Sequence, residues 1–122
     1  MREIKFRGLS FGGVWYYYEK GSLSEFFLLL EHKDCDEIIR AETVGEYTGL
    51  KDKNGKDIFE GDILRLDTWT GLQVVDFIDG AFCLVNCGKN KGFASDIHYI
   101  HHAGIPQAEV VGNIFDNKEM TV

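Results

Sequence analysis

The chain is poor in proline and in long apolar runs. It has one proline, Pro106, and 13% aromatic residues, a composition that excludes a proline-rich linker and a disordered chain. A membrane-spanning helix needs about 20 consecutive apolar residues, whereas the run Phe26 to Leu30 has five. The stretch Met1 to Arg7 alternates charged and apolar residues, unlike a signal peptide. We therefore expect no contact with a membrane and a cytoplasmic location.

Basic residues are scarce in the second half of the chain. The formal net charge is −7; residues 57–122 carry 4 basic and 10 acidic groups, and residues 1–56 carry 9 and 10. An acidic surface repels phosphate groups. The charge balance therefore disfavours nucleic-acid binding through the second half.

The cysteines and histidines superficially resemble a zinc-ligand set. Cys83 and Cys87 are four residues apart in an expected strand, which separates them by roughly 13 Å, too far for zinc–sulfur bonds of about 2.3 Å. No recognisable nucleophile accompanies His98, His101 and His102. With Cys35, the cysteines are an odd number, and we expect reduced thiols, no metal, no cofactor and no catalytic activity.

Short strands dominate the rest of the pattern. Arg2 to Arg7 alternates, which predicts Ile4 and Phe6 on a buried face and Glu3, Lys5 and Arg7 on a charged outer face. The other strands that we expect are Val14–Tyr18, Ile63–Leu66, Gln73–Ile78, Ala81–Asn86, Ile97–Ile100 and Glu109–Phe115.

The stretch near 23–31 fits two structures. Leu23, Phe26, Phe27 and Leu30 have the spacing of an amphipathic helix, which would make the fold α+β. The continuous apolar run is equally suited to a buried strand, and neighbouring segments that read as sheet favour the strand.

Two dipeptides predict hairpin turns, Asn54-Gly55 within the central stretch Gly45 to Leu66 and Asp79-Gly80 further on. A type I′ turn needs positive φ at both central residues, which Asn or Asp followed by Gly meets at low cost. We therefore expect a type I′ turn at Asn54-Gly55. We interpret the charge run Lys51 to Lys53 beside it as a solvated hairpin tip.

The aromatic run Trp15, Tyr16, Tyr17 and Tyr18 is the most prominent candidate for a functional surface. Successive strand residues face opposite sides, so at most half of the run is exposed on one face. Exposed aromatic rings suit a protein interface, or they stack nucleobases if Lys5 and Arg7 lie near by.

Three blocks of the sequence together resemble one family. They are Arg2–Gly8 (REIKFRG), Glu42–Ile63 (ETVGEYTGLKDKNGKDIFEGDI) and Val110–Asn117 (VVGNIFDN). The chain is similar in these blocks to the YopX family of phage and prophage proteins. The resemblance implies a mostly β, cytoplasmic protein of a bacterial host with no assigned activity and no site residues. The segment Glu60 to Leu66 also looks like the entry strand of small SH3-like barrels.

These observations lead to one expected architecture and function. We expect a mainly β fold in which an N-terminal β-rich part, 1–56, packs on an SH3-like barrel, 57–122, as one compact unit. The expected function is a phage accessory module that binds proteins without catalysis, and the alternative is a nucleic-acid-binding barrel. The expected partners are a second copy, through the 14–30 region, and a host or phage protein. The proposed surface comprises Trp15, Tyr16, Tyr17, Tyr18, Phe26 and Phe27, and the expected core comprises Ile4, Phe6, Ile58, Leu64, Leu66, Val75, Phe77, Leu84 and Ile114.

Overall fold

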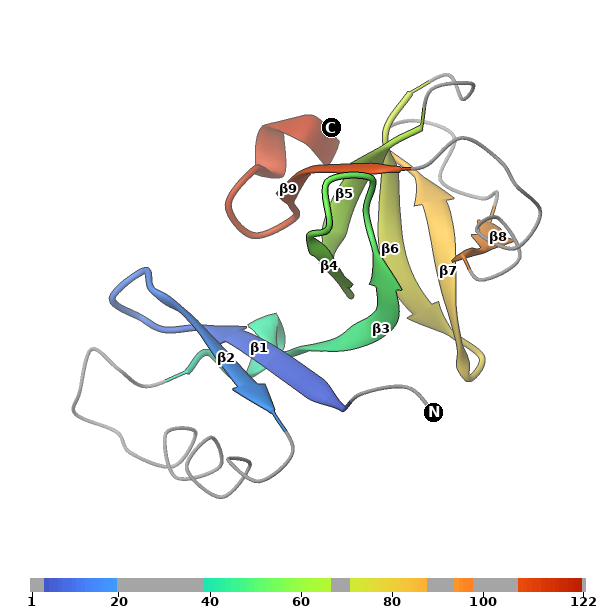
Figure 1. Ribbon diagram of the computed structural model, residues 1–122. Helices are drawn as coiled ribbons and strands as arrows, with labels where there is room; N and C mark the ends of the chain where they lie inside the picture. Colours follow the sequence, from blue (N-terminus) through green and yellow to red (C-terminus); the bar gives the residue numbers. More distant parts are fainter. Residues whose placement is uncertain (1–3, 20–38, 67–70, 88–93, 98–107, 122) are drawn as a thin grey trace. The chain divides into compact units, whose positions relative to one another are not determined.

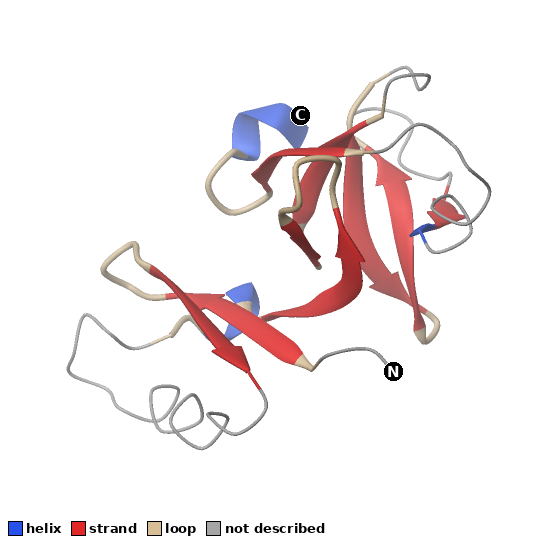
Figure 2. Ribbon diagram, viewed as in Figure 1, coloured by secondary structure: helices blue, strands red, loops and turns tan. Residues whose placement is uncertain are grey.

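The computed structural model shows a mainly β protein, as the sequence predicts (Figures 1 and 2). It describes residues 4–19, 39–66, 71–87, 94–97 and 108–121, so the stretch 23–31 lies outside the described residues. Within them, no helix is long and apolar enough to cross a membrane. The elements are β1 (Lys5–Leu9), β2 (Trp15–Glu19), η1 (Ala41–Thr43), β3 (Gly45–Lys51), β4 (Asp57–Phe59), β5 (Asp62–Arg65), β6 (Gln73–Ile78), β7 (Ala81–Asn86), β8 (Ala94–Asp96), β9 (Glu109–Asn113) and η2 (Lys118–Thr121).

The chain divides into two units, Met1–Gly49 and Leu50–Val122, whereas the sequence placed the division after Lys56. The strands form a four-stranded sheet of order β2-β1-β3-β4 and a five-stranded sheet of order β8-β7-β6-β5-β9. Strand β3 begins in the first unit and ends in the second. The likeness of the second part to SH3 barrels stays a prediction.

The first unit is built on the antiparallel pair β1–β2. Their register places Phe6 opposite Tyr18 and Arg7 opposite Tyr17. A small core forms on one side, where Tyr18 and Ile39 are buried and Phe6, Tyr16 and Val44 pack against them. The opposite side does not have the expected charged outer face. Arg7 is only 4% exposed, because its guanidinium lies over the Trp15 ring, 4.7 Å from the centroid.

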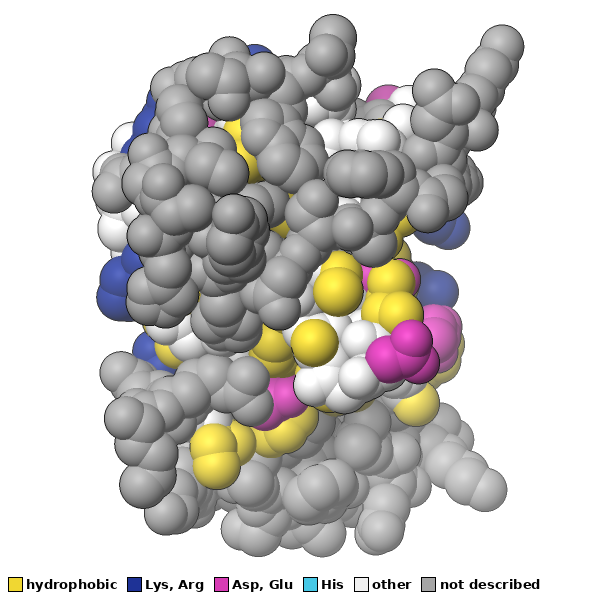
Figure 3. All heavy atoms as spheres, turned by 90° about the vertical axis from the view of Figure 1, so that its right-hand side faces the viewer, with side chains coloured by type: hydrophobic (Ala, Val, Ile, Leu, Met, Phe, Trp, Pro, Cys, Tyr) yellow, Lys and Arg dark blue, Asp and Glu magenta, His cyan; other side chains and the backbone are white. Residues whose placement is uncertain are grey.

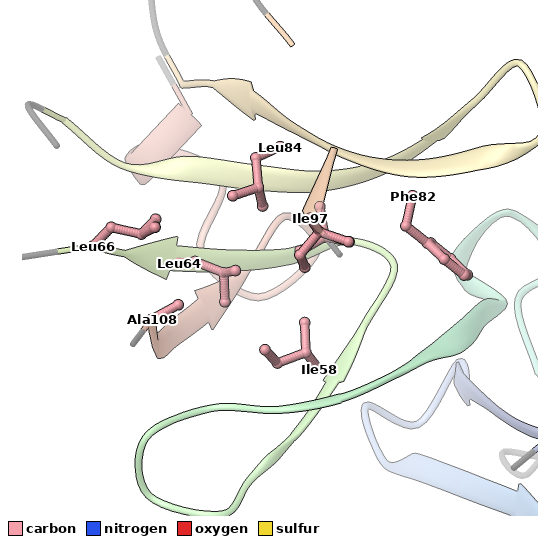
Figure 4. Packing of buried hydrophobic residues seen from close by; sticks show 8 residues of the cluster. Ile58, Leu64, Leu66, Phe82, Leu84, Ile97 and Ala108 are labelled. Carbon is pink, nitrogen blue, oxygen red and sulfur yellow. The ribbon is translucent and has the colours of Figure 1, made fainter. Parts of the chain in front are cut away.

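The second unit encloses the main core. Side chains from β4, β5, β6 and β7 and from residues next to β5, β8 and β9 converge there, and Figure 4 shows most of them pointing toward one another. Its buried members are Ile58, Leu64, Leu66, Val75, Phe82, Leu84, Ile97 and Ala108. Of the expected core residues, Ile58, Leu64, Leu66, Val75 and Leu84 are confirmed, and Phe6 and Ile114 are half-buried.

Two expected core residues are instead exposed, Ile4 at 43% and Phe77 at 47%. Phe77 lies on the same side of β6 as Val75, which is buried, so the side was predicted correctly. It pairs with Phe82 one step from the end of the β6–β7 hairpin, where it is only partly covered. Ile4 precedes the first residue of β1 and therefore lacks strand neighbours on the described chain.

The two hairpin signals give different turns. Asp79 and Gly80 both have positive φ, 50° and 82°, and connect the paired residues Ile78 and Ala81, which is a type I′ turn. The type I′ prediction for Asn54-Gly55 is wrong, because among the described residues Asp79 is the only non-glycine with positive φ. Instead, Gly55 N–H donates to the Asp52 carbonyl and Asp52 N–H to the Lys56 carbonyl. A turn of three residues that ends on a left-handed glycine replaces the two-residue turn.

Candidate interaction surface

The β1–β2 register separates the predicted aromatic run into two faces. Tyr16 and Tyr18 turn toward the small core, and Tyr18 is 7% exposed. Trp15 and Tyr17 share the other side with their partners Leu9 and Arg7, and Tyr17 is 59% exposed. Phe26 and Phe27 lie outside the described residues. Of the four described members of the predicted set, Tyr17 is the most exposed.

The turn of this hairpin presents two further apolar side chains that the sequence did not single out. Phe11 is 68% exposed and Val14 is 53% exposed; we call this pair the hairpin tip. Phe11 occupies the first position of a turn whose glycine, Gly13, has φ 85°. The exposure of Phe11 could have been predicted from the sequence, because an aromatic residue directly before Gly12-Gly13 lies in the turn and outside the paired strands.

Hydrogen bonds hold the hairpin tip in one conformation. Gly13 N–H donates to the Ser10 carbonyl, and Ser10 N–H donates to the Val14 carbonyl, 2.9 Å away. The Ser10 hydroxyl also accepts from Val14 N–H. These bonds close the turn, and both apolar side chains of the hairpin tip are exposed.

The base of the hairpin is fixed to the segment that follows in the same unit. Arg40 N–H donates to the Leu9 carbonyl, and Ser10 forms a bridge with Ile39. The buried Thr43 hydroxyl accepts from Leu9 N–H at 2.8 Å. These contacts make the hairpin a supported element rather than a free arm.

Cations lie against the aromatic rings of the first unit. Lys5 Nζ is 5.0 Å from the Tyr47 centroid, and the Arg40 guanidinium is 5.9 Å from that of Phe11. Arg40 also forms an ion pair with Glu42 at 3.0 Å. The backbone N–H of Glu42 and then Arg40 lower the pKa of the Glu42 carboxyl. A cation thus lies over the exposed Phe11 ring of the hairpin tip, and Glu42 pairs with this cation.

The buried Asp52 of the second unit has a structural role. Asp52 is 6% exposed, which corrects its interpretation as part of a solvated tip, although Lys51 and Lys53 are exposed. Its carboxylate accepts from the N–H groups of Asn54, Lys56 and Val110. Burial raises the pKa of Asp52, but these three backbone hydrogen bonds outweigh it and the net pKa is lowered. A carboxylate so fully engaged stabilises the turn and is not placed to act on a ligand.

Of the cysteines and histidines that resemble a zinc-ligand set, the structure describes Cys83 and Cys87. Cys83 and Cys87 are half-buried and form no disulfide, and the described part of the chain holds no group of three metal-ligating side chains. His98, His101 and His102 lie outside it.

Comparisons with known proteins place the chain in a family. A comparison with curated proteins gives no match. Among solved structures, the chain is similar to the crystal structure of protein EF1440 from Enterococcus faecalis, with a TM-score of 0.61, 18% sequence identity and 100% of both chains covered. At this identity the likeness shows the fold alone. The YopX protein model matches residues 12–120, which is most of the chain. The chain therefore belongs to the YopX family.

Proposed function

We propose that this YopX-family chain is a non-enzymatic module that binds other proteins through its β1–β2 hairpin. One observation carries the proposal: Phe11, Val14 and Tyr17, all on one ordered hairpin, are each more than half exposed. The proposal assigns the chain no catalytic role and no cofactor.

The physical basis is the cost of leaving such side chains in water. Covering large apolar side chains with a partner makes the free energy of association more favourable. Aromatic residues contribute most of this free energy in many interfaces. Because the turn is already held by its own hydrogen bonds, binding sacrifices little backbone freedom. An ordered hairpin with an exposed aromatic tip therefore suits insertion into an apolar pocket of a partner.

The family suggests the setting in which such a partner would be found. We propose a phage- or prophage-encoded protein that acts in the cytoplasm of a bacterial host and binds a host or phage protein. Self-association through the 14–30 region, where β2 contributes Tyr17, is part of the same proposal.

Affinity capture with matched variants tests the proposal. The tagged chain and its Phe11→Ser and Ile4→Ser variants would be used to capture proteins from the host, with quantification by mass spectrometry. Ile4 is the matched control, since it is an exposed apolar residue that precedes the hairpin. We expect a partner that Phe11→Ser loses and Ile4→Ser retains. Equal recovery with all three chains would refute a role for the hairpin.

Nucleic-acid binding is the second candidate, favoured by the position of Lys5 and Arg7 on the same side as Trp15 and Tyr17. Two facts weigh against it. Arg7 is buried against Trp15, and the chain has a net charge of −7. We therefore expect no salt-sensitive binding of DNA or RNA in a mobility-shift assay at low salt. Tight binding that weakens with salt would favour this candidate over a protein-binding module.

A further inference from the structure

A second ordered hairpin, in the other unit, also presents apolar side chains at its end. Phe77 is 47% exposed and Ile78 is 37% exposed, next to the type I′ turn at Asp79-Gly80. Asp76 and Asp79 are exposed beside them. We call the four residues Asp76, Phe77, Ile78 and Asp79 the acidic tip.

Local contacts hold the acidic tip in place. The Phe77 ring packs edge-on against Phe82, with centroids 5.0 Å apart, and the Asp76 carboxylate accepts from Phe77 N–H at 2.8 Å. Hydrophobic and acidic side chains adjoin each other on the face that Figure 3 shows, which is the side of the β6–β7 hairpin in Figure 1. The apolar side chains are thus exposed on a fixed support.

The two hairpins carry opposite charge. Residues 73–86 contain two carboxylates, Asp76 and Asp79, and no lysine or arginine. The β1–β2 hairpin, Lys5–Glu19, contains Lys5, Arg7 and one acidic residue, Glu19, so its net charge is +1. Arg40, which forms an ion pair with Glu42, lies over the exposed Phe11 ring. Each hairpin therefore combines exposed apolar side chains with a net charge, and the signs of the two net charges are complementary.

We infer that the acidic tip of one copy binds the β1–β2 hairpin of a second copy. Phe77 and Ile78 would cover Phe11 and Val14, and the carboxylates would face Arg40. The inference rests on the proposed function, because it uses the same β1–β2 hairpin as a binding surface. Beyond the proposed function, the inference identifies one binding partner, a second copy of this chain, and the surface on it that binds, the acidic tip.

This arrangement predicts a particular kind of assembly. Because two different surfaces meet, the contact is heterologous, and each bound pair leaves one surface of each kind open. Copies would then add head to tail into rings or chains rather than stop at a symmetric dimer. Salt would weaken the assembly, since exposed charges contribute to it.

Sedimentation of two variants, alone and mixed, tests the inference. Phe11→Ser removes one surface and Phe77→Ser removes the other, and melting curves establish that each variant is folded. We expect the wild-type chain to associate as its concentration rises. The dissociation constant of each variant alone should be at least about tenfold higher than that of the wild type. An equimolar mixture should form a 1:1 dimer, because one intact surface of each kind remains.

A charge variant isolates the electrostatic part without disturbing the turn. Asp76→Asn with Asp79→Asn removes both charges, and Asn-Gly still suits a type I′ turn. We expect roughly fivefold weaker association at low salt. Unchanged association at low salt would contradict the contact with Arg40.

Two further outcomes would overturn the inference. If Phe77→Ser associates like the wild-type chain while Phe11→Ser does not, two β1–β2 hairpins bind each other, and the proposed function survives without this contact. If the wild-type chain stays at 13.9 kDa at every concentration, the second copy is not the occupant. Affinity capture then still tests the proposed function independently.

Discussion

The carboxylate of Asp52 accepts a hydrogen bond from the backbone N–H of Val110, 58 residues further along the chain, at 3.0 Å. Lys53 N–H donates to the Ala108 carbonyl beside it. These bonds join the hairpin between β3 and β4 to the start of β9. A single buried side chain thereby connects a local turn to the sheet of the second unit.

Removing this carboxylate should destabilise the protein. Asp52→Ala leaves three backbone N–H groups without their acceptor, and we expect a loss of about 3 kcal/mol in the free energy of unfolding. Asp57→Ala is the control, because it removes an ion pair with the exposed Lys51 and should cost less than about 1 kcal/mol. Urea unfolding measures both. Equal losses would contradict the role of Asp52.

The same group predicts a dependence of stability on pH. Burial raises the pKa of Asp52, but three backbone hydrogen bonds lower it further, so the folded value lies below the unfolded value of about 3.9. The stabilisation is therefore present above about pH 3.9 and is lost as the pH falls through the folded pKa. We expect the difference in urea midpoint between wild type and Asp52→Asn to shrink below about pH 4. A difference that stays constant on acidification would rule this out.

The turn at Asp79-Gly80 gives a test of backbone conformation. Asp79 has φ 50°, which a β-branched residue adopts only with strain. We expect Asp79→Val to lower the free energy of unfolding by about 1–2 kcal/mol, whereas Asp79→Asn should be nearly neutral. Thermal melting compares the two, and equal melting temperatures would show that this conformation is not needed.

Gly112 leaves room for the side chain of Asn117. A Cβ atom at position 112 would lie 2.8 Å from Asn117 Cγ, and Asn117 Oδ1 accepts from Asn113 N–H. We expect Gly112→Ala to cost about 2 kcal/mol. The cost should fall in an Asn117→Ala background, because the contacts with Oδ1 and Cγ are then absent and only the 3.3 Å contact with Cβ remains. A double-mutant cycle with independent, additive effects would contradict this contact.

The sequence predicted the β6–β7 hairpin well because alternation and turn residues act locally. Gln73–Ile78 and Ala81–Asn86 were placed at their observed bounds. The strand expected from Ile97 was misplaced, since β8 spans Ala94–Asp96 and ends before Ile97. The turn at Asn54 was not predictable from its dipeptide alone. The Asp52 carboxylate, two residues earlier, accepts from Asn54 and Lys56 N–H, which favours a three-residue turn over type I′.

Burial was predicted less well because it depends on contacts that are distant in sequence. Alternation placed Arg7 on an outer face, but Trp15 on the paired strand covers its guanidinium. Alternation also placed Phe77 on the correct side of β6, yet could not show that the core ends before it. Of the candidate surface, the aromatic run was visible in the sequence, whereas the exposure of Phe11 and Val14 depends on how the turn is held.

Site-specific photocrosslinking tests the central claim most directly. A photoreactive phenylalanine analogue would replace Phe11 in one chain and Lys118, which is exposed outside the hairpin, in another. Both chains would be irradiated in host cells at matched expression levels. If the β1–β2 hairpin is a protein-binding surface, we expect a crosslinked partner from position 11 and none from position 118. Crosslinks from position 11 only within its own chain, or the same products from both positions, would contradict the account.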